Sequence, residues 1–165
     1  MDGRQWRHEV MRAESTALST RGTVENFLAR LAAGDVDGVA ALFAERVDWD
    51  VPGAVEVPWL GIRATRAEVA DYFTTHPTYV TKEEFVVERT LVDGAEAAVS
   101  GRFRSRVIRN GAAMESWFVL QLTVLEGEIT RYRFYEDSLA VARAWAATAT
   151  GADGRAREAH SGTTG

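Results

Sequence analysis

The chain has 165 residues, a formal net charge of -5 and no cysteine, which excludes disulfide scaffolds, thiolate nucleophiles and cysteine-ligated metal sites. Hydrophobic residues make up 46% of the sequence and charged residues 26%, as in a single soluble domain with a substantial core. We find neither an apolar run of the ~20 residues that span a membrane nor the apolar stretch of a secretory signal. We therefore expect a cytoplasmic protein that binds no membrane and, with its acidic balance, no nucleic acid.

Two polar segments flank the patterned part of the chain. Residues 1–22 are polar and weakly patterned, and residues 151–165 are rich in Gly, Ala, Ser and Thr. Such compositions bury little apolar surface. We expect both segments to be loosely ordered and one domain to span residues 23–150.

The first half of this domain predicts three helices and one strand. Residues 24–31 repeat at helical spacing between a candidate N-cap, Thr23, and a stop at Gly34. A short helix capped by Asp35 follows, and residues 46–51 alternate as a strand. A loop then leads to a capping box at residues 65–68, which opens a helix that we expect to end at Pro77.

The second half predicts an antiparallel meander. Four β-rich runs lie between residue 79 and about residue 137, separated by Asp93-Gly94, Asn110-Gly111 and Glu126-Gly127. The first two pairs are typical of tight hairpins, because both residues tolerate positive φ. A last helix follows, capped by Asp137 or Ser138. The whole pattern predicts an α+β roll with its helices on one face of a curved sheet.

The hairpins indicate which side chains face inward. A two-residue turn at Asn110-Gly111 pairs Arg109 with Ala112 and leaves an apolar face on both strands. At Glu126-Gly127 a two-residue turn would bury Arg131 and Arg133, at a cost of several kcal/mol. A three-residue turn, which we prefer, directs Tyr132 and Phe134 inward instead.

The opposite face of the sheet combines arginines with aromatic residues. Side chains of both kinds are enriched at protein interfaces. We therefore expect a homodimer through this outer face, whose central residues are Arg104, Trp117, Arg133 and Tyr135.

Several stretches resemble one family. The segments ENFLARLAAGDVDGVAALF, VDWDVPG, PWLG and LEGEITRYRFYEDS are similar to the nuclear transport factor 2-like superfamily, in particular its SnoaL-like and ketosteroid-isomerase-like branch. The resemblance spans roughly residues 23–147. It implies a cone-shaped, cystatin-like α+β roll with a cavity closed by helices on the inner face of a curved mixed or antiparallel sheet.

The resemblance does not extend to the family's catalytic residues. Polyketide cyclases of this branch carry an acid/base Asp on the last strand, at the position of Phe134, and a His at the position of Tyr132. Limonene-epoxide-hydrolase-like enzymes use an Asp at that same place, together with an earlier Arg-x-Asp. The corresponding Arg102-Phe103-Arg104 keeps the Arg and lacks the Asp.

Three residues remain candidates for acid/base chemistry. Asp50 stands near the end of the first strand, where desolvation would make it a stronger base; the alternative is a solvated charge. His76 lies on the apolar face of its helix and could exchange a proton at the cavity mouth, or simply complement the helix end. Tyr132 points inward and could donate to an enolate oxygen, or be an ordinary core residue.

The expected wall of the cavity is largely aromatic. It comprises Trp49, Trp59, Tyr72, Phe73, Phe103, Met114, Ser116, Phe118 and Phe134. We find no phosphate-binding glycine loop, dinucleotide fingerprint or metal-ligand cluster, so we expect neither metal nor cofactor. The sequence thus favours an acid/base enzyme of secondary metabolism acting on an apolar, polyketide-like or polycyclic molecule by cyclisation, isomerisation, dehydration or hydration. The alternative is a non-catalytic ligand-binding or homodimeric interaction module.

Overall fold

The computed structural model describes residues 3–148, so the predicted tail at 151–165 lies outside the described residues. The elements of this part are α1 Gly3–Ala33, α2 Val36–Ala40, β1 Phe43–Val51, β2 Gly61–Thr65, α3 Arg66–Tyr79, β3 Val80–Asp93, β4 Glu96–Val107, β5 Ala113–Leu125, β6 Glu128–Tyr135 and α4 Ser138–Ala146. The predicted α+β class and the meander are confirmed.

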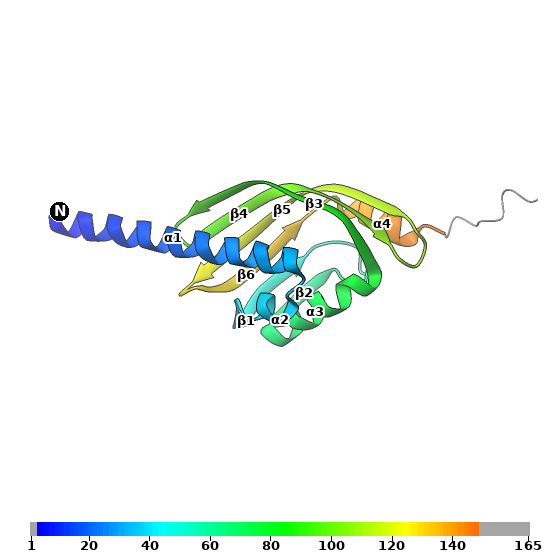
Figure 1. The fold of residues 1–165 in the computed structure, drawn as a ribbon, viewed down its shortest axis with the longest axis horizontal. Coiled ribbons are helices and arrows are strands. Elements are labelled where there is room, and N and C mark those ends of the chain that lie inside the picture. The colour runs from blue at the N-terminus through cyan, green and yellow to red at the C-terminus, as the bar shows by residue number, and fades with distance from the viewer. Residues whose placement is uncertain (1–2, 149–165) are drawn as a thin grey trace, which may run out of the picture.

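The strands form one curved, mixed sheet in the order β2-β1-β6-β5-β4-β3. β1 is parallel to β6, while the other neighbouring strands are antiparallel. The sheet is open, with β2 and β3 at its edges. Figure 1 shows α1, α2 and α3 on the concave side of the sheet. The concave face is therefore the one that carries the core.

The helix caps follow the predicted chemistry. Asp35 caps α2 and Asp137 caps α4. At the start of α3, Thr65 and Glu68 form a capping box in which each side chain accepts a hydrogen bond from the other residue's backbone N–H. Gly34 ends α1 with a φ of 69°, a left-handed conformation that costs glycine little.

Two helix boundaries differ from the prediction. α1 begins at Gly3, not at Thr23, and so runs through most of the first 22 residues; this stretch is rich in helix formers, and Figure 1 shows it extending beyond the sheet. α3 passes Pro77 and ends at Tyr79. A proline in the last turn removes only one backbone hydrogen bond there.

Strand β2 was expected to be part of a loop. It pairs antiparallel with β1, with Trp49 opposite Arg63 and Asp50 opposite Ile62. Its five residues, Gly61–Thr65, are too few to show an alternation in the sequence. The edge position next to β1, rather than the local pattern, makes this segment a strand.

The turn between β4 and β5 is longer than predicted. β4 ends at Val107 and β5 begins at Ala113, so that Ser105 pairs with Met114 and Phe103 with Ser116. The predicted partners are thus displaced by two residues. A displacement by two keeps every side chain on its predicted face, and Val107, Met114 and Phe118 are buried as expected.

The turn between β5 and β6 has two residues, with positive φ at Glu126 and Gly127, and Leu125 pairs with Glu128. The predicted three-residue turn is therefore wrong. A bulge at Thr130 changes the register, so that Tyr132 rather than Arg131 lies opposite the buried Leu122. The bulge inserts one residue and achieves the predicted result: the arginines stay out of the core.

Candidate active site

A cavity of about 360 Å³ lies between the helices and the concave face of the sheet. Its volume is within the range of ~300–1,000 Å³ typical of small-molecule sites. Most of its wall is apolar, and its ionisable lining groups include two tyrosines and four other side chains: Tyr72, Tyr132, Asp35, His76, Lys82 and Glu136. A few polar groups in an apolar chamber are the usual composition of a site that orients a ligand.

Most of the predicted wall lines this cavity. The aromatic and apolar members are Trp59, Tyr72, Phe73, Phe103, Met114 and Phe134. The other three predicted wall residues are not among the lining residues. Trp49 and Phe118 lie behind the wall, stacked on Tyr132 at 3.7 Å and on Phe134 at 5.2 Å between ring centroids. The Ser116 hydroxyl instead accepts a hydrogen bond from the Asp137 N–H at 2.8 Å.

Asp50 is not brought to the cavity. It lies on β1 between Trp49 and Val51, whose side chains are 0% and 2% exposed and face the core. Successive residues of a strand point to opposite faces, so Asp50 belongs to the outer face. Among the three candidate catalytic residues, only His76 and Tyr132 line the cavity.

Tyr132 is held rigidly by aromatic packing. Its ring lies parallel to that of Trp49, with 3.7 Å between the ring centroids and an interplanar angle of 5°, and it meets Phe27 edge to face with 6.2 Å between the centroids. Burial raises the pKa of its hydroxyl well above the ordinary value of 10, because the phenolate would lose its hydration. Tyr132 therefore stays protonated at neutral pH and is a hydrogen-bond donor.

His76 is neutral at physiological pH. Burial, with smaller contributions from the positive charges of Arg63 and Lys82, lowers its pKa from 6.5 to about 4. Its ring lies 5.3 Å from Tyr72 and 5.9 Å from Trp59. A neutral imidazole in this position can donate or accept a hydrogen bond but carries no proton to give at pH 7.

Glu136 is a site residue that the sequence analysis missed. It follows β6 directly, lines the cavity and is mostly buried. Burial, and to a lesser extent the charge of Asp137, raises the pKa of its carboxyl from 4.5 to about 7. A carboxyl group with this pKa exchanges protons readily at neutral pH. The alternation Tyr132, Phe134, Glu136 could have indicated it, had it been extended one step past the strand.

A half-buried guanidinium lies beside the tyrosines. The Cζ atom of Arg63 is 4.5 Å from the ring centroid of Tyr72 and 5.5 Å from that of Trp49. Its Nη2 donates to the carbonyl of Trp59 at 3.3 Å, while its buried Nη1 has no partner among residues 3–148. Its positive charge favours the ionised form of both Tyr72 and Tyr132, which makes their hydroxyls stronger donors.

The side chains that face the cavity are not tied to one another. Across the described part of the chain, we find no hydrogen bond made by the side chains of Tyr72, His76, Tyr132 or Glu136. Their polar atoms also do not belong to the fully buried, unpartnered atoms, which are in Trp49 and Arg63. These four groups thus reach open space in the cavity, where a ligand could bind them.

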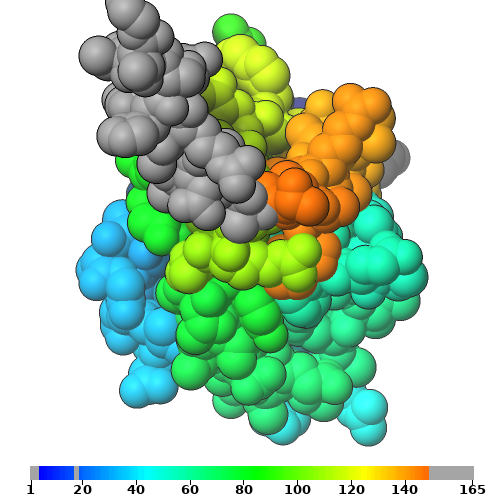
Figure 2. Space-filling model, turned by 90° about the vertical axis from the view of Figure 1, so that its right-hand side faces the viewer, coloured from blue at the N-terminus to red at the C-terminus, as the bar shows by residue number. Residues whose placement is uncertain are grey.

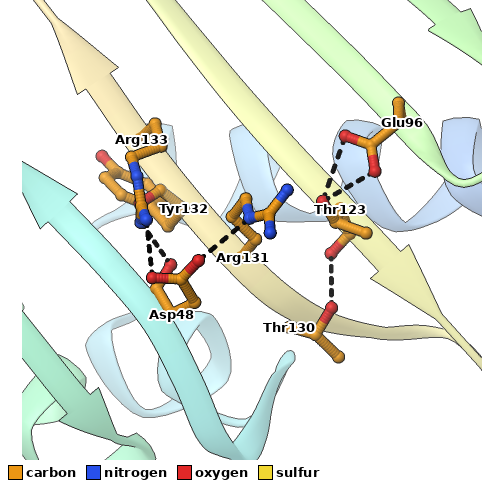
Figure 3. A network of polar contacts seen from close by, with 7 residues as sticks. All are labelled: Asp48, Glu96, Thr123, Thr130, Arg131, Tyr132 and Arg133. Atoms are coloured by element: carbon orange, nitrogen blue, oxygen red, sulfur yellow. Dashed lines mark hydrogen bonds and ion pairs between the residues drawn. The ribbon is translucent and has the colours of Figure 1, made fainter.

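The arginines on the outer face of the sheet form ion pairs with neighbouring acids. Asp48 on β1 accepts from Arg131 at 3.0 Å and from Arg133 at 2.6 Å. Figure 3 shows this bridge, with Tyr132 projecting to the other side of β6. On β4, Arg102, Arg104 and Arg106 all pair with glutamates at 2.7–2.8 Å. The arginines that cluster in the sequence are therefore neutralised within the sheet.

Helix α4 closes the end of the roll beside the β4–β5 turn. The side-chain amide of Asn110 donates to the carbonyls of Ala144 and Ala147 at 2.9 and 2.8 Å. The Arg109 guanidinium lies 3.9 Å from the centroid of Trp145. Figure 2 shows α4 packed against this turn. Val141 of α4 thereby forms part of the cavity wall.

Comparison with known proteins identifies the family. Residues 24–132 match the model of the SnoaL-like domain. The chain belongs to the SnoaL-like family. The predicted membership of the nuclear transport factor 2-like superfamily is therefore confirmed. The chain matches no curated protein significantly.

Solved structures share the fold of this SnoaL-like domain. An NTF2-like protein from Burkholderia xenovorans LB400 is 27% identical, with a TM-score of 0.71 over 78% of this chain and 96% of the other. A proposed isomerase from Bacillus subtilis is 19% identical, with a TM-score of 0.67 over 79% and 96% of the two chains. A proposed ketosteroid isomerase from Kribbella flavida DSM 17836 is 22% identical, with a TM-score of 0.55 over 73% and 78%.

Neither a membrane-crossing helix nor a metal-binding cluster occurs among the described residues. None of the helices within residues 3–148 combines the length and apolar character that crossing a bilayer requires. The same residues contain no group of three or more His, Cys, Asp or Glu side chains placed to hold a metal ion.

Proposed function

We propose that this SnoaL-like domain is an isomerase-type enzyme that moves a proton within an apolar cyclic ketone. The single observation that carries the proposal is the cavity carboxyl of Glu136, whose pKa is raised to about 7, in the same chamber as the hydroxyl of Tyr132. An acid/base group that titrates near neutrality and a fixed donor are the two elements that such a reaction needs. The isomerase descriptions of several structural neighbours agree with this class of reaction.

The roles of the residues follow from their protonation states. In a β,γ-unsaturated ketone, the ionised carboxylate of Glu136 removes a proton from the α carbon between the carbonyl group and the double bond, and the electron pair moves onto the carbonyl oxygen to give a dienolate. The Tyr132 hydroxyl donates a hydrogen bond to the resulting enolate, assisted by the nearby charge of Arg63. Glu136 then returns the same proton at the γ carbon, the double bond moves into conjugation, and no external reactant is consumed.

The proposed base, Glu136, lies at a different position from the catalytic Asp of the polyketide cyclases that this chain resembles. Phe134 occupies the position of their catalytic Asp, and its ring packs against Phe118 at 5.2 Å. Glu136 stands one step further along the same side of the chain and lines the same cavity. The chamber therefore still contains a carboxyl group, but at a position other than that of the catalytic Asp of the cyclases.

Removal of the Tyr132 hydroxyl tests the proposed donor. Tyr132→Phe keeps the ring stacked on Trp49 and removes only the O–H group, so we expect kcat/KM to fall about a hundredfold with unchanged stability. The assay is the rise in ultraviolet absorbance as a polycyclic β,γ-unsaturated ketone becomes conjugated. The control is Tyr135→Phe, an exposed tyrosine of the same strand; equal activities of the two variants would contradict the role of Tyr132.

A non-catalytic binding protein is the second candidate, and the largely apolar wall of the cavity favours it. Such a protein would bind the ketone in the same cavity without converting it. Incubation with the wild-type protein, followed by chromatography of the ketone, separates the two candidates. Unchanged ketone recovered from a saturated complex would leave only the binding function.

The expected homodimer through the outer face remains a proposal. Its supporting observations are the exposure of Trp117 (67%) and Tyr135 (45%) beside the paired Arg104 and Arg133. We expect Trp117→Glu to convert a dimer into a monomer in sedimentation experiments, because it places a charge in an apolar contact. Leu139→Glu, at an exposed position on α4, is the control; a wild-type protein that sediments as a monomer would exclude the dimer.

A further inference from the structure

Lys82 is a cation on the inner face of the sheet that the proposed reaction does not use. It is the only lysine of the sequence, in which 18 of the 19 basic residues are arginine. On β3 it pairs with Ser105, a buried residue of the concave face, and both line the cavity. The Lys82 side chain is nevertheless exposed. The ammonium group therefore lies where the cavity meets solvent.

Four acids adjoin Lys82 in the sequence or line the same cavity; three are engaged by other cations, and the fourth, Glu136, makes no ion pair within the described residues. Glu83 and Glu84, which follow it in the sequence, pair with Arg106 and Arg102 at 2.8 Å. Asp35, which lines the same cavity, pairs with Arg30 at 2.7 Å. Within residues 3–148 Lys82 itself has no ion-pair partner.

The local backbone explains this separation of charges. The pairing of β3 with β4 shifts between Lys82 and Glu84, so Glu83 is an extra residue of a bulge. Lys82 thereby stays opposite Ser105 on the inner face, while Glu84 lies opposite Arg104 on the outer face. The bulge presents a cation to the cavity and keeps both adjacent carboxylates away from it.

We propose that Lys82 binds an anionic group, such as a carboxylate or sulfonate, on the ligand of this cavity, so that the preferred ligand is an apolar ring system with an acidic substituent. The inference rests on the proposed function, since it assigns the substrate class of the same cavity. In this arrangement the apolar rings contact Phe103 and Phe134, and the anionic end remains at the mouth beside Lys82. A neutral ligand would leave the ammonium without a partner and gain less from binding.

Two dyes with one ring skeleton provide the test. 8-Anilinonaphthalene-1-sulfonate carries a sulfonate, and N-phenyl-1-naphthylamine is its neutral counterpart. Fluorescence titration of the wild-type protein at low salt should show binding of one dye molecule per chain, mutual competition, and tighter binding of the sulfonate. We expect Lys82→Met to weaken binding of the sulfonate about tenfold and to change binding of the neutral dye less than twofold.

Arg89→Met is the matched control, because Arg89 is an exposed cation of the same strand that pairs with Ser100 of β4. It removes the same charge and should leave both affinities unchanged. Equal weakening by both variants, or no effect of Lys82→Met while the neutral dye still binds, would overturn the role of Lys82 but leave the cavity enzyme standing. Failure of both dyes to bind the wild-type protein would overturn the inference and the proposed function together.

A purely protective role is the competing explanation. Charged residues on the inner side of an edge strand prevent sheets from associating edge to edge, and β3 is an edge strand. In that case Lys82→Met would aggregate at high concentration while both dye affinities stayed at the wild-type level. This result would overturn the proposal.

Discussion

Replacing Glu136 with Gln should lower kcat/KM for the β,γ-unsaturated ketone by about a thousandfold, within the ~10²–10⁴ range of general acid–base catalysis. Glutamine keeps the size of the side chain and its contacts with the cavity wall, but it has no basic oxygen. The substrate should still bind, because the apolar wall is unchanged. The loss should therefore appear in kcat rather than in KM.

The pH profile distinguishes a catalytic carboxyl from a structural one. Because the pKa of Glu136 is about 7, wild-type kcat/KM should rise with pH through 7 and then level off as the carboxylate forms. The residual rate of Glu136→Gln should show no such rise. Asp137→Asn removes the neighbouring charge that helps to raise the pKa of Glu136, so its kcat/KM should still rise with pH, but with the midpoint of the rise moved to lower pH. A Glu136→Gln variant with near wild-type activity would end the proposed mechanism.

The second large effect concerns stability and pH, because two cavity groups respond in opposite directions. The pKa of Glu136 is raised from 4.5 to about 7, so its contribution to stability is greatest below pH 4.5 and is lost as the pH rises through 7. The pKa of His76 is lowered from 6.5 to about 4, so its contribution is present above pH 6.5 and is lost as the pH falls through 4. Each shift corresponds to on the order of 3 kcal/mol.

Between pH 4.5 and 6.5 the two contributions change with pH in opposite directions, so their pH dependences should largely cancel in the wild-type protein. Glu136→Gln should match wild-type stability near pH 4.5 and exceed it, by on the order of 3 kcal/mol, above pH 7. His76→Gln should instead match the wild-type protein near pH 7 and exceed it near pH 4.5. Urea unfolding of the three proteins between pH 4.5 and 8 measures these differences. A constant difference across this range would show that neither group is buried as described.

Burial of the Glu136 carboxyl group both lowers the stability of the fold and makes the group useful in catalysis, for one physical reason. A carboxyl group that loses hydration in an apolar chamber destabilises the fold when it ionises. The same loss of hydration makes it a stronger base at neutral pH. A Glu136→Gln variant that is both inactive and more stable above pH 7 would show the two consequences in a single protein.

Much of the fold could be predicted from local chemistry. The caps at Asp35, Thr65 and Asp137 act through side chains and backbone groups within a few residues. Strand alternation placed Tyr132 and Phe134 on the inner face even though the turn was wrong. This worked because the cost of burying Arg131 and Arg133 selects the face, whatever turn or bulge achieves it.

Local chemistry predicted only part of the candidate site. His76 and Tyr132 were correctly predicted to line the cavity, because the periodicity of their helix and strand directs them inward. The alternation of β1 directs Asp50 to the outer face, since its neighbours Trp49 and Val51 are buried. Glu136 and Lys82 were missed, since one follows the end of a strand and the other precedes a bulge. At a bulge the alternation of a strand no longer tells which way a side chain points, and past the end of a strand it need not continue, although at Glu136 it does.

The sequence by itself therefore determined the family, every element type except that of β2, and the apolar character of the chamber, because these depend on residue type and short-range spacing. The tertiary structure decided which ionisable groups meet inside it and at what pKa. Burial and the distance to other charges govern a pKa, and both arise only when residues as far apart as His76, Tyr132 and Glu136 are folded around one cavity.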